Sequence, residues 1–150
     1  MTHPSLLSAS ASQQQFGITV VRVVTGIVFA MHGVQKVFVY GLPGLADSFG
    51  KMGVPMPGVM GPFIGLLEFF GGLALIIGLL TRLAALGLAF DMLGAILLVH
   101  AARGFFLPSG AEFVLMLCAS AFAIALAGPG ALSVDGMIAS RAHRRTAAVD

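Results

Sequence analysis

The sequence of 150 residues is poor in charge and in cysteine. Charged residues make up 9% of it, against roughly a quarter in an ordinary soluble domain. The single cysteine, Cys118, excludes an internal disulfide and a CxxC thiol relay. The net charge is only +2, so we expect no nucleic-acid partner. The chain contains neither an HExxH motif nor a phosphate-binding glycine loop, so we expect no metal site and no nucleotide site.

Long apolar runs are what the sequence has instead. Hydrophobic residues make up 58% of the chain, and its mean hydropathy is +1.01. Four runs are each about 20 residues long, the length that crosses a hydrocarbon core of about 30 Å. They cover residues 16–39, 58–80, 83–102 and 112–132. We therefore predict an all-α membrane protein, an antiparallel bundle of four transmembrane helices.

The runs divide the chain into three parts. We predict a flexible N-terminal tail at 1–15, the transmembrane domain at 16–137 and a basic C-terminal tail at 138–150. The segment 40–58 contains three prolines, so we expect an irregular cap on the membrane surface there. An even number of spans places both termini on one side. Arg82 and the arginines of the C-terminal tail favour the cytoplasm for that side.

Ionisable residues interrupt the apolar runs. Glu68 lies within the second run, where an ionisable group costs roughly 2.5 to 3.5 kcal/mol. At about 1.5 Å per residue, Asp91 lies about 14 Å above the turn at 81–82, with Glu68 and His32 at about 20 Å. We predict that His32, Glu68 and Asp91 meet near the midplane and form a catalytic group.

A second set of ionisable residues is predicted nearer the membrane surfaces. Lys36, His100 and Glu112 are expected together near the outer face, and Arg22 near the inner one. These four are candidate substrate-binding residues. In each span the ionisable residue shares a helical face with glycine or alanine, for example Gly87 and Gly94 with Asp91. Because small residues mark close helix contacts in membranes, we expect all these faces to point into the bundle.

The chemistry that suits such a group is limited. A histidine beside carboxylates in an apolar cavity can hydrogen-bond the oxygens of a lipophilic molecule and exchange protons with it. A quinone or quinol is the ligand that fits best. A haem held by His32 and His100 is a weaker alternative, because the two differ in depth. Buried ion pairs that only fix helix register are the structural alternative.

Five segments resemble the DoxX family. They are RVVTGIVFAMHGVQKVF, FGKMGVPMPGVMG, LLEFFGGLALIIGLLTRLAA, HAARGFF and GAEFVLMLCASAFAIALAGPGALSVD, and they span residues 16–137 in the family's order. The resemblance implies a small four-helix protein of the bacterial inner membrane. It also implies a link to thiosulfate-to-quinone electron transfer, to resistance against quinones and catechols, or to complexes that handle oxidative stress.

Two classes of function follow. The first is a quinone-interacting redox or oxidative-stress component with its site inside the bundle. The second is a non-catalytic anchor or assembly subunit for a partner oxidoreductase. A small permease is a weaker third, since four helices line a path only by oligomerising. The expected partners are the lipid bilayer, a quinone-like molecule, an oxidoreductase and a second copy of the chain.

Overall fold

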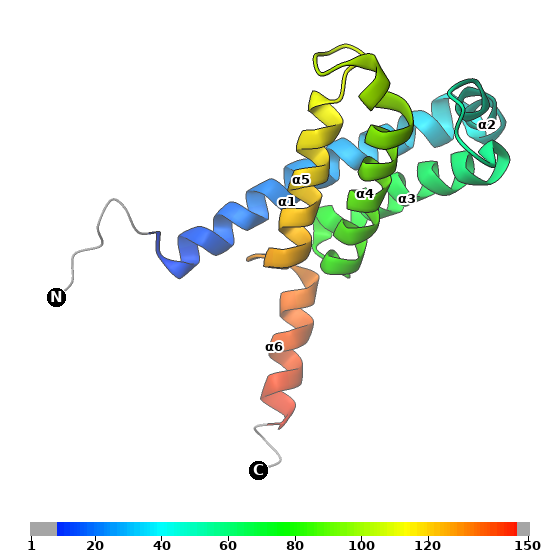
Figure 1. Ribbon diagram of the computed structural model, residues 1–150. Coiled ribbons are helices and arrows are strands. Elements are labelled where there is room, and N and C mark those ends of the chain that lie inside the picture. The colour runs from blue at the N-terminus through cyan, green and yellow to red at the C-terminus, as the bar shows by residue number, and fades with distance from the viewer. Residues whose placement is uncertain (1–8, 147–150) are drawn as a thin grey trace.

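The computed structural model describes residues 9–146, all of whose regular elements are helical (Figure 1). The long helices are α1 (Ala11–Val34), α3 (Pro57–Ile77), α4 (Thr81–Ala95) and α5 (Glu112–Ala127). Shorter helices are α2 (Gly41–Lys51), the 3₁₀ turn η3 (Ala101–Arg103) and α6 (Val134–Thr146). Two π-helical turns, η1 (Gln35–Val39) and η2 (Ile96–His100), extend α1 and α4.

The predicted helical membrane bundle is confirmed, with three long apolar helices and one shorter one. Ala11–Val39, Pro57–Ile77 and Thr81–Arg103 are long and apolar enough to cross a membrane. The fourth, α5, has 16 residues and is about 24 Å long. It ends at Ala127 and not near residue 132, because Gly128 (φ 93°) and Pro129 break the helix.

Other boundaries also differ from the prediction. α1 begins at Ala11, where Ser10 and Gln13 form a capping box, so residues 11–15 are helical and not a tail. Residues 1–8 and 147–150, the outer parts of the two predicted tails, lie outside the described residues. Most of the predicted C-terminal tail belongs to α6. The cap at 40–58 is not irregular, since it contains α2, whose Pro43 lies in the first turn, where a proline is tolerated.

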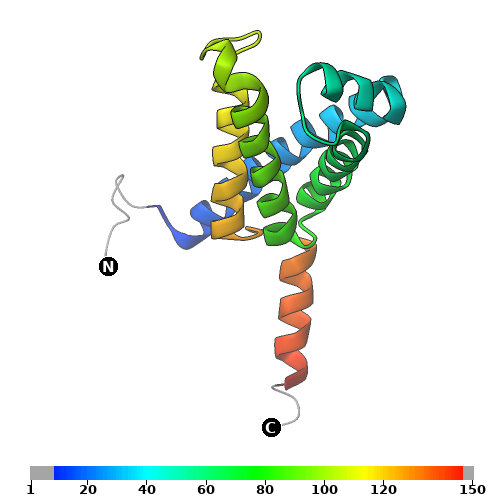
Figure 2. The ribbon, with the colours of Figure 1, turned by 45° about the vertical axis from the view of Figure 1, so that its right-hand side comes forward.

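The long helices form two antiparallel pairs, α1 with α3 and α4 with α5, that lie obliquely to each other (Figures 1 and 2). Glycines bring α1 and α3 close together. A Cβ at Gly33 would lie 2.3 Å from the backbone nitrogen of Phe69, and one at Gly72 would lie 2.3 Å from that of Ala30. The prediction that small residues mark a close contact is therefore confirmed for this pair.

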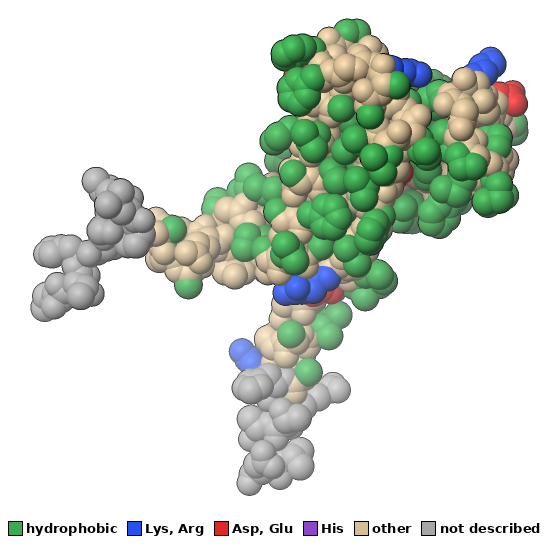
Figure 3. All heavy atoms as spheres, in the orientation of Figure 1, with side chains coloured by type: hydrophobic (Ala, Val, Ile, Leu, Met, Phe, Trp, Pro, Cys, Tyr) green, Lys and Arg blue, Asp and Glu red, His purple; other side chains and the backbone are tan. Residues whose placement is uncertain are grey.

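The outside of the bundle is apolar. Large hydrophobic side chains are exposed along α1, α3, α4 and α5, as expected for helices that face lipid. Figure 3 shows apolar side chains over most of one face, with charged side chains mainly at its ends. The buried core lies between α3, α4 and α5 around Leu75, Leu88 and Ile124.

The start of α1 and the end of α5 lie at the same end of the bundle. The hydroxyl of Thr19 donates to the carbonyl of Ala131 at 2.7 Å, and the amide of Ala131 donates to the carbonyl of Gln15. We call this end, with the α3–α4 turn and α6, the tail end. We call the opposite end, with η1, α2, η2 and η3, the loop end. That the tail end faces the cytoplasm remains a prediction.

Candidate functional site

An ion pair joins η1 to α3 inside the bundle. Nζ of Lys36 lies 2.6 Å from Oε2 of Glu68, whose side chain is only 2% exposed. Glu68 lies on the buried face of α3, between Gly65 and Gly72. Lys36 was predicted nearer the outer surface, but the long stem of a lysine moves its charge about a helical turn from its Cα. The pair satisfies the charge of Glu68.

Asp91 of α4 lies beside this pair and is less well satisfied. Its carboxyl group interacts with the Glu68 carboxyl and with the Lys36 ammonium. Its Oδ2 is buried and has no hydrogen-bond partner among the described residues. Two carboxyl groups in contact can hydrogen-bond each other only when one of them carries a proton. Contact between these two carboxyl groups therefore needs a shared proton or the ammonium of Lys36 beside both of them.

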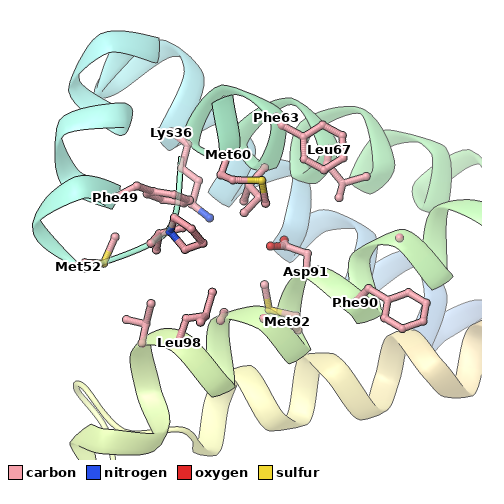
Figure 4. A pocket seen from close by; sticks show the side chains of 17 residues that line it. Lys36, Phe49, Met52, Met60, Phe63, Leu67, Phe90, Asp91, Met92 and Leu98 are labelled. Atoms are coloured by element: carbon pink, nitrogen blue, oxygen red, sulfur yellow. The ribbon is translucent and has the colours of Figure 1, made fainter. Parts of the chain in front are cut away.

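The cluster opens into a cavity of about 400 Å³ (Figure 4). Figure 4 shows the ammonium of Lys36 and the carboxyl group of Asp91 extending toward each other across it. Most of the remaining side chains that line it are apolar. They include three phenylalanines and three methionines, namely Phe49, Phe63, Phe90, Met52, Met60 and Met92. Its volume lies in the range of small-molecule sites, which are largely apolar with a few polar groups.

Two glycines of α4 leave room around Asp91. Gly87 and Gly94 both line the cavity, and a Cβ at Gly94 would meet nothing within 4 Å. The prediction that these small residues mark a close helix contact is therefore wrong for Gly94, which faces empty space, whereas a Cβ at Gly87 would lie 3.4 Å from Cδ1 of Leu67 on α3. The sequence also predicted that Glu112, Ala119 and Ala123 share the inward face of α5, and this is wrong, because Ala119 and Ala123 are exposed while Cys118 and Ala121 are buried.

The mouth of the cavity lies on the lipid-facing side of the bundle. α3 and α4 meet at the tail end and diverge toward the loop end (Figure 2). Phe63 of α3, Phe90 of α4 and Leu98 of η2 line the cavity and are more than half exposed. At the loop end α2 covers it, with Leu45 and Phe49 packed near Ile64 and Val99. A lipophilic molecule can thus reach the cluster from the bilayer.

His32 has other neighbours than the predicted ones. Its Nδ1 donates to the carbonyl of Val28 at 2.9 Å. Its ring lies 5.9 Å from that of Phe113 on α5, and it lines a separate surface hollow with Gln35. Lys36, one turn further along α1, is the basic group that meets Glu68. The helical period correctly predicted that a basic residue near the end of α1 faces α3. It did not predict that Lys36, rather than His32, contacts Glu68.

His100 and Glu112 stabilise the loop between η3 and α5. Nδ1 of His100 donates to the carbonyl of Ser109, and Oε1 of Glu112 accepts from the amide of Leu107. Neither lines the cavity. These contacts give no support to substrate binding by the two residues, nor to a haem between His32 and His100. Within residues 9–146 no group of three His, Cys, Asp or Glu side chains gathers as a metal site would require.

Arg22 is a structural residue of the tail end. It is fully buried, and its guanidinium donates to the carbonyls of Leu75 and Ile76 at the end of α3 and to that of Leu132. These are carbonyls that a helix end leaves without partners, and a cation there also complements the helix dipole. The prediction of Arg22 as a substrate-binding residue finds no support in this position.

Asp135 completes the tail end. It accepts from the amides of Leu80 and Thr81 at 2.9 and 2.8 Å and so caps the start of α4. Burial raises the pKa of this carboxyl group, but the hydrogen bonds from Thr81 and Leu80 and the charge of Arg22 outweigh burial and hold that pKa below its usual range.

The sequence analysis missed the contribution of the segment 40–60. Phe49, Met52, Val54 and Pro55 line the cavity, although the segment was expected only to cap the bundle. The sequence feature that accompanies this lining is the alternation of apolar residues with glycine and proline in FGKMGVPMPG. Such a pattern predicts a turn, but it does not reveal which side chains face inward.

The fold and the cavity define a multi-pass helical membrane protein with a polar cluster in its interior. The DoxX family profile matches residues 17–101. The chain therefore belongs to the DoxX family.

Several relatives match most of the chain. It is 32% identical to "Putative oxidoreductase CatD" of Bacillus subtilis over 83% of this chain and 88% of that protein. It is 36% identical to "Inner membrane protein YqjF" of Escherichia coli, over 83% and 94%. It is 29% identical to an uncharacterized membrane protein of Mycobacterium tuberculosis, over 93% and 90%. No solved structure matches the chain at a significant level.

Proposed function

We propose that this protein is a quinone-interacting redox component of the inner membrane that serves in oxidative stress. The observation that carries the proposal is the cluster of Lys36, Glu68 and Asp91, in which Lys36 and Asp91 line an apolar cavity whose mouth faces lipid. A quinone ring needs an apolar slot and hydrogen-bonding groups at its oxygens. Membership of the DoxX family and the name of the Bacillus relative, which calls that protein an oxidoreductase, support a redox role.

The three polar side chains take different parts. The ammonium of Lys36 donates a hydrogen bond to one ring oxygen, and Glu68 holds that ammonium in place. Asp91 exchanges a proton with the ring hydroxyl and shares it with Glu68. Oxidation of a quinol breaks two O–H bonds and releases two protons and two electrons. One proton passes to the deprotonated Asp91–Glu68 pair and the other passes to water, and the electrons pass to a partner oxidoreductase or to a second substrate.

One observation favours the alternative of an anchor subunit. α6 projects from the tail end of the bundle (Figure 1), with Met137 and Ile138 each more than half exposed. A partner oxidoreductase bound there would receive its membrane anchor from this chain. Purification in mild detergent tests this alternative, because it is supported by an enzyme that co-purifies with the full chain and is lost from a chain truncated after residue 136, which keeps Asp135 as the cap of α4.

Quinone binding can be measured with a fluorescence reporter, since the sequence has no tryptophan. Phe63→Trp places one indole at the mouth of the cavity, where bound decylubiquinone quenches it. Phe16→Trp is the matched control, because Phe16 is equally exposed but lies on α1 near the tail end. Saturable quenching in the first reporter, with only linear quenching in the second, supports binding in the cavity.

The cluster is tested on the same reporter. Glu68→Gln keeps the shape of the side chain and removes the charge that holds the ammonium of Lys36 in place. We therefore expect the affinity for decylubiquinone to fall about tenfold or more, which corresponds to the loss of one hydrogen bond to a charged group. Removing one member of a buried pair also destabilises the fold. The double variant Lys36→Met with Glu68→Gln removes both charges and separates the two effects. Wild-type affinity in a folded double variant would exclude this site for the quinone.

A further inference from the structure

The polar cluster beside the cavity contains two acids, Glu68 and Asp91, and one base, Lys36. Lys36 is the only cationic side chain among the described residues that line the cavity, and it is paired with Glu68 at 2.6 Å. Asp91 lines the same cavity, and its buried Oδ2 has no hydrogen-bond partner among the described residues. An ionised carboxylate in such surroundings needs a counter-charge. Lys36 is already paired with Glu68, so Asp91 must hold a proton, share that ammonium with Glu68 or lie beside a further cation.

The rest of the lining indicates which kind of cation fits. A metal ion needs several oxygen or nitrogen ligands, and beyond the cluster the lining offers mainly phenyl rings and thioethers. The faces of phenyl rings attract organic cations, and methionine sulfur adapts its shape to irregular ligands. Figure 4 shows Met60 and Met92 near Asp91 and Phe49 beside Lys36, and the exposed Phe63 and Phe90 also line the cavity.

We infer that this cavity also binds lipophilic organic cations, which replace the proton held between Asp91 and Glu68. In the exchange one O–H bond breaks, the proton leaves to water, and the ammonium of the ligand takes its place beside the carboxylate. Entry from the bilayer through the open mouth between α3 and α4 suits a cation with apolar substituents. This activity is independent of quinone binding, although the two ligands compete for one space.

The groups that face Asp91 support a single exchangeable proton. η1 contributes Lys36 and α3 contributes Glu68, and both interact with it. On α5, Cys118 donates to the carbonyl of Ala89, and Glu112 binds the amide of Leu107. The charged residues of α2, Asp47 and Lys51, are exposed. No other ionisable group of the described residues lines the cavity, so one cation should release one proton.

The test compares two probes of the same shape. Benzyltrimethylammonium carries a charge, and neopentylbenzene has a carbon atom in place of the nitrogen. Binding of each to the full chain in detergent is measured by calorimetry at about pH 6 and about pH 8, in two buffers that differ in protonation enthalpy. Release of one proton raises the affinity for the cation by about tenfold per pH unit where the pair is protonated. The neutral probe should show neither effect.

Variants locate the exchange. Asp91→Asn keeps the shape and removes the acid, so affinity for the cation should fall about tenfold or more while the neutral probe binds as before. Asp47→Asn, which removes an exposed acid of α2, is the matched control and should leave both affinities unchanged. Equal binding of the two probes by the wild type, or cation binding without proton release, overturns the inference even if Asp91→Asn does not fold.

Quinone titrations on the same preparations separate this inference from the proposed function. Quinone binding without cation binding overturns only the cation exchange. Cation binding without quinone binding overturns only the redox proposal.

Discussion

The tail end and the cavity hold their buried charges in opposite ways. At the tail end, the terminal nitrogens of Arg22 donate to three backbone carbonyls, and both oxygens of Asp135 accept from backbone amides. In the cavity, Lys36 meets one carboxylate while Asp91 keeps a buried oxygen without a partner. Nε of Arg22 is also buried without a hydrogen-bond partner in the described part of the chain, but Arg22 does not line the cavity, so its contacts with the backbone serve to stabilise the fold. A charge that lacks a contact and borders empty space is available to a ligand.

Glycines mark the same difference. At Gly78 (φ 70°) a Cβ would lie 2.5 Å from Cβ of Ser133 and 2.7 Å from Nη1 of Arg22. At Gly94 a Cβ would meet nothing within 4 Å. The first glycine is there because the chain is crowded, and the second leaves space unfilled.

Arg22→Met should cause the largest loss of stability. It leaves the carbonyls of Leu75, Ile76 and Leu132 without their donor in a buried site, which costs about 3 kcal/mol. Arg82→Met is the matched control, because Arg82 also donates to two helix-end carbonyls but is exposed, so water can replace it. Unfolding in mixed detergent micelles measures both. Equal losses in the two variants would show that burial of the arginine is unimportant.

Gly78→Ala should cost about 2 kcal/mol. An L-residue in the left-handed region pays about 1 to 2 kcal/mol, and the contact with Ser133 adds to that. The same unfolding assay measures it. Because Gly78 lies at the tail end, quinone affinity per folded molecule should not change. A folded variant with wild-type stability would mean that the α3–α4 turn relaxes without cost.

Sequence reasoning predicted the bundle better than the cavity. Apolar runs of about 20 residues have one physical cause, the thickness of a bilayer, so the spans followed directly. Glu68 was identified as a site candidate because an acid within such a run is costly. The neighbours of that acid could not be derived in the same way. His32 and Lys36 are one turn apart on one face of α1, and only the packing of α1 against α3 decides that Lys36 meets Glu68.

Small residues misled the sequence analysis in part. Gly33 and Gly72 do mark a close contact between α1 and α3, whereas Gly87 and Gly94 line the cavity. The two cases look alike in sequence, because a glycine is compatible both with a near neighbour and with none. Arg22 was misread for a related reason. A buried cation can bind a substrate or backbone carbonyls, and the carbonyls at the end of α3 become visible only in the fold.

Asp135→Asn should have a smaller effect, of about 1 kcal/mol, because it weakens the cap of α4 without emptying a buried site. The pKa of Asp135 is lowered in the folded state. Its contribution is therefore fully present above about pH 4, the usual pKa of an aspartate, and is lost as the pH falls through the lower folded value. The difference in stability between wild type and variant should shrink below that pH. A constant difference would show that the charge of Asp135 plays no part.

The smallest change in stability, and the opposite sign, is expected at Gly94. Gly94→Ala should stabilise the chain by about 0.5 to 1 kcal/mol, because alanine has the higher helix propensity and the added Cβ meets no neighbour. Gly94→Leu should fold equally well, but its side chain occupies the space beside Asp91 and should abolish binding of decylubiquinone and of benzyltrimethylammonium. Thermal stability and both affinities are measured on one preparation. At Gly78 an added methyl group should destabilise the protein without affecting its ligands, and at Gly94 a larger side chain should do the reverse. If Gly94→Leu bound both ligands with wild-type affinity, the cavity beside Asp91 would not be their site, even though the tail-end predictions still held.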